Sequence, residues 1–164
     1  DAVGYDMVPV DIEIVKKFAP NYINFLKELK VYDLFTYVGF SGSKGIQKEQ
    51  CPIHIDHKNW IDFKNIENLS FGLNLPIIGC ENSYTVFYDV TYADGVEKGS
   101  RVTNRYYKSV GYPDHSSKEI ARLSATQPAW VNVGIPHKPV TEHQDLRIIA
   151  SARFSSEIFN YFNK

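Results

Sequence analysis

The sequence from residue 69 to residue 91 points to the fold class. It reads Leu69-Ser-Phe-Gly-Leu-Asn-Leu-Pro-Ile-Ile78, then Gly79-Cys-Glu-Asn-Ser83, then Tyr84-Thr-Val-Phe-Tyr-Asp-Val-Thr91. The two longer runs are rich in aromatic and branched apolar residues, which favour strands, and the segment between them has turn residues. Similar runs predict further strands at Leu34–Phe40, Pro52–Asp56, Arg101–Val110, Ile120–Ala125, Ala129–Pro136 and Leu146–Phe154. Seven or eight short strands at such intervals predict a β-sandwich or barrel.

The first third of the chain has a helical pattern instead. Apolar residues recur at helical spacing from Ile12 to Leu29, Asp11 can cap the first helix, and Pro20 interrupts the pattern. We expect a loop at Ser41–Gly45 and a short closing helix at Ser156–Lys164. The sequence therefore predicts one domain, with a helical layer at 1–33, strands at 34–155 and a tail at 156–164.

Composition narrows the classes of function. The chain has 164 residues, 18 basic against 19 acidic, for a formal net charge of −1, which argues against an electrostatic grip on nucleic acid. No apolar run approaches the ~18 residues needed to cross a bilayer, so no membrane association is expected. Cys51 and Cys80 could form at most one disulfide, which favours a reducing compartment and predicts a cytoplasmic location. The sequence does not specify the oligomeric state.

The segment Pro52-Ile-His-Ile-Asp56 has the sharpest chemical pattern. Side chains alternate between the faces of a strand, so Ile53 and Ile55 can enter a core while His54 and Asp56 share the opposite face. Two metal ligands on one strand need this arrangement. The alternative for so short a motif is a solvent-facing polar pair on an edge strand.

A second pattern lies near the C-terminus, where an apolar run from Trp130 passes through Gly134 and Pro136 to His137. Glycine and proline there indicate that the strand ends or bulges, which would place His137 at a rim. Ten residues later, Arg147 lies within an apolar strand, and a buried arginine needs an anion. That anion is either a structural carboxylate or the carboxylate of a ligand.

Together these residues form one candidate site. Two imidazoles and one carboxylate on one face of a metal ion make the triad of non-haem Fe(II) oxygenases, with positions left open for a chelating keto acid and O₂. The charges are balanced, because Fe(II), Asp56, a dicarboxylic keto acid and Arg147 sum to zero.

The order His54, Asp56, His137, Arg147 resembles the motif of the 2-oxoglutarate- and Fe(II)-dependent dioxygenases. The resemblance implies a double-stranded β-helix, which is a cupin-like jelly roll, with His54, Asp56 and His137 as iron ligands. It implies that Arg147 pairs with the distal carboxylate of 2-oxoglutarate. The implied activity is an oxygenase that couples decarboxylation of 2-oxoglutarate to hydroxylation of a small molecule or a peptide side chain. Leu73–Ile77 and Ile148–Phe154 also resemble small oxygenase-like proteins of marine microbes and phages.

The sequence departs from this family motif in one respect and leaves three questions open. Many members carry serine two residues after the arginine, where this chain has Ile149, and its serine is Ser151. Arg153 shares a strand face with Arg147, so either could hold the co-substrate. Asn74 is a second candidate contact or a structural amide. The other two classes of function are a non-catalytic jelly-roll binding module and a cupin-type metalloenzyme that does not use 2-oxoglutarate.

Overall fold

The structure, a computed structural model, describes residues 6–44, 53–56, 71–90, 101–103, 108–112, 117–142 and 145–163. The chain begins with β1 (Asp6–Val10), α1 (Ile12–Phe18) and α2 (Pro20–Glu28). It continues through ten more strands: β2 (Phe35–Lys44), β3 (Ile53–Asp56), β4 (Phe71–Ile78), β5 (Ser83–Val90), β6 (Arg101–Thr103), β7 (Lys108–Tyr112), β8 (Ser117–Ser124), β9 (Ala129–Asn132), β10 (His137–Thr141) and β11 (Leu146–Phe154). A 3₁₀ turn at Ser156–Ile158 and helix α3 (Phe159–Phe162) follow.

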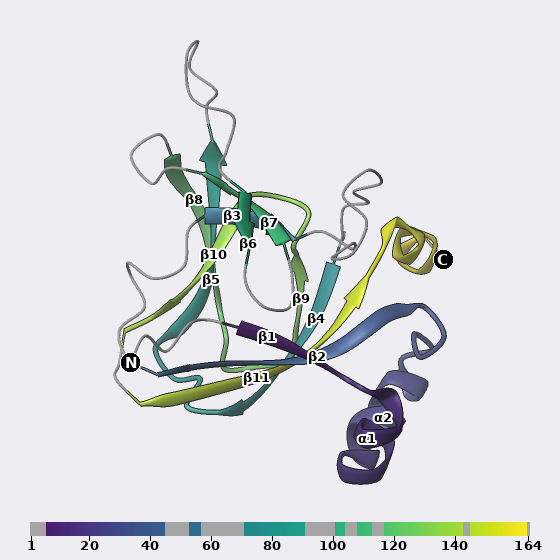
Figure 1. Ribbon diagram of the computed structural model, residues 1–164. Coiled ribbons are helices and arrows are strands. Elements are labelled where there is room, and N and C mark those ends of the chain that lie inside the picture. The colour runs from purple at the N-terminus through teal and green to yellow at the C-terminus, as the bar shows by residue number, and fades with distance from the viewer. Residues whose placement is uncertain are drawn as a thin grey trace.

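The strands form two antiparallel sheets, so the protein is mainly β, as the sequence predicts (Figure 1). Sheet A has the order β1-β2-β11-β4-β9, and sheet B has the order β6-β7-β3-β10-β5-β8. The pairing is nested: β2 pairs with β11, β3 with β10, β4 with β9, and β5 with β8. Strands distant in sequence are therefore neighbours, and sheet A holds both the first strands, β1 and β2, and the last strand, β11.

The helices cover one face of sheet A. Val15, Tyr22 and Leu26 are buried in one cluster with Ala152 and Phe154 of β11. The predicted cap is present, because the Asp11 carboxylate accepts a hydrogen bond from the backbone N–H of Glu13 at 2.7 Å. Since side chains alternate along β11, the face that does not touch the helices carries Arg147, Ile149, Ser151 and Arg153. That inner face is directed between the sheets.

Three local predictions are corrected, and two strands are added to those expected. Residues 41–44 continue β2 instead of opening a loop, because they pair with β1 and β11. The predicted strand Arg101–Val110 is two strands, and Arg101 lies opposite Val110. The predicted strand Ala129–Pro136 ends at Asn132. Two strands were not foreseen, β1 inside the predicted helical layer and β10 directly after the expected strand end.

Candidate metal and co-substrate site

The two predicted histidines are neighbours in sheet B. His54 of β3 and His137 of β10 lie directly opposite each other in register, and their ring centroids are 4.6 Å apart. Both are buried, with exposed fractions of 3% and 4%. Residues that are 83 positions apart in sequence thus present two imidazoles at one place, as a shared metal ion requires.

The turn before β10 fixes the orientation of His137. The side chain of Asn132 accepts a hydrogen bond from the N–H of Gly134 at 3.0 Å, and the carbonyl of Pro136 accepts one from the N–H of Tyr88 at 2.9 Å. His137 Nδ1 lies 2.9 Å from the carbonyl oxygen of Ile135. A carbonyl only accepts, so Nδ1 carries the proton in this contact. A backbone contact of this kind is usual behind a histidine ligand.

Asp56 is the third predicted ligand. It is the last residue of β3, and its Cα lies opposite Ser109 of β7. Its side chain lies outside the described residues. Among the side chains that are described, no group of three or more His, Cys, Asp or Glu residues gathers at one place. The described part of the site is therefore the histidine pair.

Arg153, Asn74 and Ser151 form a polar cluster on the inner face of sheet A. Arg153 Nη1 donates to Asn74 Oδ1 at 3.0 Å and to Ser151 Oγ at 2.5 Å, and Ser151 Oγ donates to Asn74 Oδ1 at 2.5 Å. Arg153 is 6% exposed and Ser151 is fully buried. The sequence-predicted residues Asn74 and Arg153 are thus in direct contact, although they are 79 positions apart.

The histidine pair and the Arg153 cluster belong to two facing rows of residues. In sheet B the row is His54, His137 and Phe87, while in sheet A it is Tyr37, Arg153, Gly72 and Val131. Tyr37, Val131 and Phe87 pack in one apolar cluster with Val133 and Leu123. The Phe87 ring centroid lies 6.3 Å from that of His137. The two rows therefore meet through the apolar core between the sheets.

Arg147 lies further along the same inner face. It is 1% exposed and sits six residues before Arg153, which is roughly 20 Å along a strand. Its Cα lies opposite Ser43 of β2. Between the two arginines, Ile149 packs with Cys80 and Ala125, and Cys80 is a free thiol. Arg153 therefore belongs to the row of sheet A that faces the histidines, whereas Arg147 lies in a different row, opposite Ser43.

Sequence reasoning missed Gly72. A Cβ built at Gly72 would lie 1.8 Å from Arg153 Nη1 and 2.9 Å from its Cζ, so the guanidinium occupies the space that a side chain would fill. The sequence held one indication of this role: Gly72 is two positions before Asn74, so both lie on the same face of the strand. The remaining histidines, His57, His115 and His143, lie outside the described residues.

No family model, curated protein or solved structure matches this chain. Among the described residues, no helix is both long and apolar enough to span a membrane.

Proposed function

We propose that this protein is a jelly-roll oxygenase that depends on Fe(II) and 2-oxoglutarate. The fold part of the proposal is supported by the nested pairing of β2–β11, β3–β10, β4–β9 and β5–β8. A long hairpin rolled into two sheets gives this pairing, which is the arrangement of an eight-stranded jelly roll. The strands β1, β6 and β7 would then be additions at the edges of the two sheets.

The observation that carries the functional proposal is the buried, cross-strand pair His54–His137. Two imidazoles with 4.6 Å between their centroids fit two adjacent positions of one metal ion, and the Ile135 carbonyl holds the ring of His137 through Nδ1. Asp56, two residues after His54, would supply the carboxylate. Fe(II) held by these residues, together with 2-oxoglutarate and O₂, would supply the oxidising chemistry, while the chain binds the groups, orients them and excludes water.

The inner face of β11 would hold the co-substrate. Arg153, fixed by Asn74 and Ser151, would pair with the distal carboxylate, because its row meets the histidine row through the apolar cluster, and Arg147 is the alternative partner. A buried guanidinium suits this role because it binds carboxylates through paired hydrogen bonds. The substrate would be a small molecule or a peptide side chain that enters at the histidine end.

The test is an anaerobic titration of the apo-protein with Fe(II) and then 2-oxoglutarate, followed by the visible charge-transfer absorption of a chelated keto acid. We expect the absorption in the wild type and its loss in His54→Ala and His137→Ala. Lys16→Ala, an exposed change on helix α1, is the control and should keep it. Arg153→Ala should bind Fe(II) but raise the dissociation constant of 2-oxoglutarate about tenfold or more, and Arg147→Ala tests the alternative partner in the same way.

Each alternative function gives a different result in the same titration. If Fe(II) binds at the histidines without any 2-oxoglutarate absorption, the protein is a cupin-type metalloenzyme of another kind. If no metal binds, the non-catalytic binding module is the better assignment. If only one arginine variant loses affinity, that arginine is the clamp.

A further inference from the structure

We propose that Gly72 is a positioning residue that fixes the guanidinium of Arg153 beside the histidine row. Only one part of this inference rests on the proposed function, namely that the ligand of Arg153 is 2-oxoglutarate. The geometry stands on its own, since an added Cβ at Gly72 would lie 1.8 Å from Arg153 Nη1 and 3.3 Å from Asn74 Oδ1. Contacts of these lengths force the guanidinium to move.

Gly72 is needed for space and not for an unusual backbone. Among the described glycines, only Gly79 has a φ in the left-handed region, at +60°. Gly72 lies in the middle of ordinary pairing, between Arg153 of β11 and Val131 of β9. A larger residue at position 72 would therefore be tolerated by the strand itself, and its cost would come through Arg153.

The guanidinium is the far end of a flexible side chain, but here it has little freedom to move. Arg153 is 6% exposed, and its Nη1 is held by the oxygen atoms of Asn74 and Ser151. Displacing it breaks those two hydrogen bonds inside the sandwich, where polar groups are costly to leave unsatisfied. Gly72, Asn74 and Ser151 thus form a cradle that sets where the positive charge of Arg153 lies.

A stability cycle tests the cradle without any ligand. We expect Gly72→Ala to lower the melting temperature by about 4 °C or more. In an Arg153→Lys background, where Nη1 is absent, Gly72→Ala should lower the melting temperature much less. Gly42→Ala is the matched control, because its added Cβ would meet only the carbonyl oxygen of Arg147 at 3.8 Å. An equal cost of Gly72→Ala in both backgrounds would overturn the proposal. If Arg153→Lys does not fold, Asn74→Ala replaces it as the background.

A binding experiment tests the consequence for function. With Fe(II) bound, Gly72→Ala should weaken 2-oxoglutarate binding about tenfold, and Gly42→Ala should not. Fe(II) affinity should be unchanged in both variants, which separates loss of the Arg153 position from general damage. Unchanged 2-oxoglutarate affinity in Gly72→Ala would overturn the positioning role. If the wild type itself binds no 2-oxoglutarate, the proposed function fails, and the stability cycle alone decides the cradle.

Discussion

At the scale of single residues, Tyr22 shows how burial changes a titration. Its ring is 5% exposed in the cluster between α2 and sheet A. Burial raises the pKa of the Tyr22 phenol well above its usual value, and the positive charge of Arg153 offsets only part of this effect. A buried phenol must stay neutral, because the phenolate loses its hydration in the apolar cluster.

This shift predicts a loss of stability in alkali. Because the folded state has the higher pKa, the contribution of Tyr22 is complete below the unfolded value of about 10 and is lost as the pH rises toward the folded value. Tyr22→Phe should therefore lose less stability between pH 9 and 11 than the wild type, as measured by urea unfolding. The half-exposed Tyr161, changed to Phe, is the control. Equal losses in the wild type and Tyr22→Phe would contradict the prediction.

In the candidate site, some residues could be predicted from the sequence and others could not. His54 and Asp56 were expected on one strand face, and Asn74 and Arg153 were expected as co-substrate contacts. The structure adds the cross-strand distances, the Ser151 hydrogen bonds and the role of Gly72. A glycine in a strand has no side chain to indicate its purpose, so its role is visible only once its neighbour in space is known.

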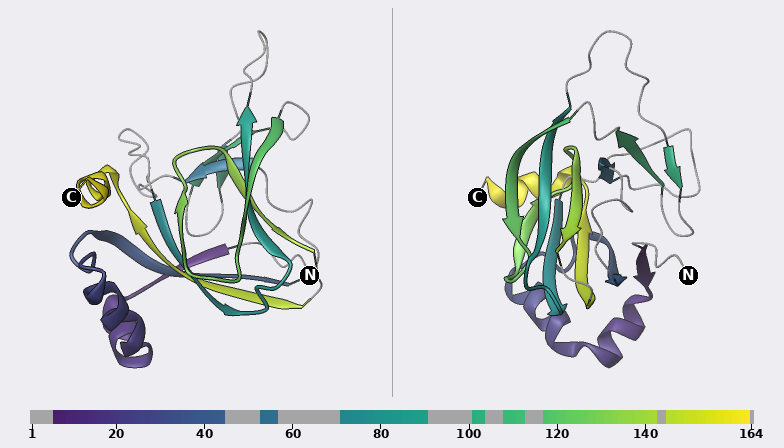
Figure 2. Two further views of the ribbon diagram at one scale, coloured as in Figure 1. Left: turned by 180° about the vertical axis from the view of Figure 1, so that it is seen from behind. Right: turned by 90° about the vertical axis from the view of Figure 1, so that its left-hand side faces the viewer.

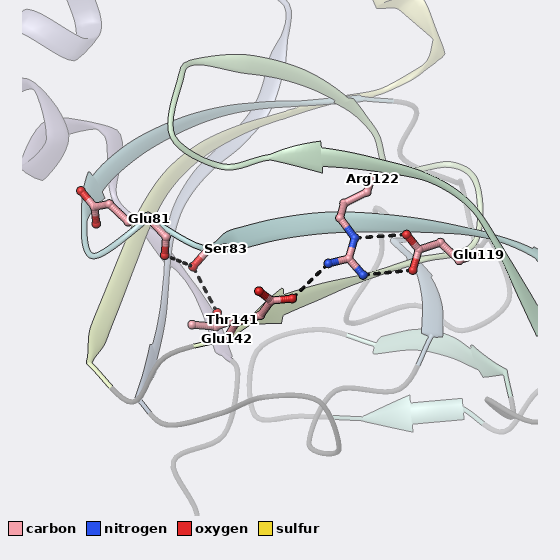
Figure 3. A network of polar contacts seen from close by, with 6 residues as sticks. All are labelled: Glu81, Ser83, Glu119, Arg122, Thr141 and Glu142. Carbon is pink, nitrogen blue, oxygen red and sulfur yellow. Dashed lines mark hydrogen bonds and ion pairs between the residues drawn. The ribbon is translucent and has the colours of Figure 1, made fainter.

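At the scale of elements, β8 shows how an exposed edge strand is protected against pairing with the sheet of another molecule. It forms the outer margin of sheet B (Figure 2), and most of its residues are exposed. The register with β5 shifts near Ile120, which is a bulge that places Glu119 and Arg122 together. Arg122 binds both oxygens of Glu119 at 3.1 Å and Glu142 at 3.1 Å (Figure 3), and the bond with Arg122 lowers the pKa of Glu119. Bulges and charges of this kind discourage pairing between sheet edges.

Removing these charges should therefore change association more than stability. We expect the double variant Glu119→Val, Arg122→Val to aggregate faster in light scattering, while its unfolding free energy changes by about 1 kcal/mol or less. The matched control is Glu13→Val, Lys16→Val, which removes an exposed ion pair from helix α1 and not from a strand. A double variant that aggregates no faster than this control would count against edge protection.

The elements that sequence reasoning missed have a common cause. Strand β10 holds Lys138 and Pro139 between His137 and Val140, so neither alternation nor a long apolar run marks it. It is a strand because β3 and β5 lie on its two sides. Residues 41–44 are likewise rich in glycine and serine, and they are held as strand by β1 and β11. Neighbouring strands override weak local preference.

At the scale of the whole molecule, the nested pairing dictates how the chain must fold. Phe40 of β2 lies opposite Ala150 of β11, although most of the chain separates them. The chain loses conformational entropy when it closes so long a loop, before the strand pairing can stabilise the closed state. Such topologies therefore fold slowly.

We therefore expect refolding on the millisecond-to-second scale or slower. Trp130 is a suitable probe, because its ring lies 5.2 Å from that of Phe154 at the end of β11 and 5.1 Å from that of Phe162. Stopped-flow fluorescence of a Trp60→Phe variant would follow this closure, and Phe154→Ala should slow the recovery or lower its amplitude. Complete recovery of the Trp130 signal within microseconds would contradict a closure step that depends on distant strands.

The sequence by itself determined the mainly β class, the capped N-terminal helices and the parity that places Arg147 with Arg153. These follow from local physics, because side-chain alternation and capping depend on residues a few positions apart. Only the tertiary structure decided that His54 meets His137, that Arg153 rests on Gly72 with Asn74 and Ser151, and that Arg147 lies further along β11. Register between distant strands is set by the packing of the two sheets as a whole, and no local pattern specifies it.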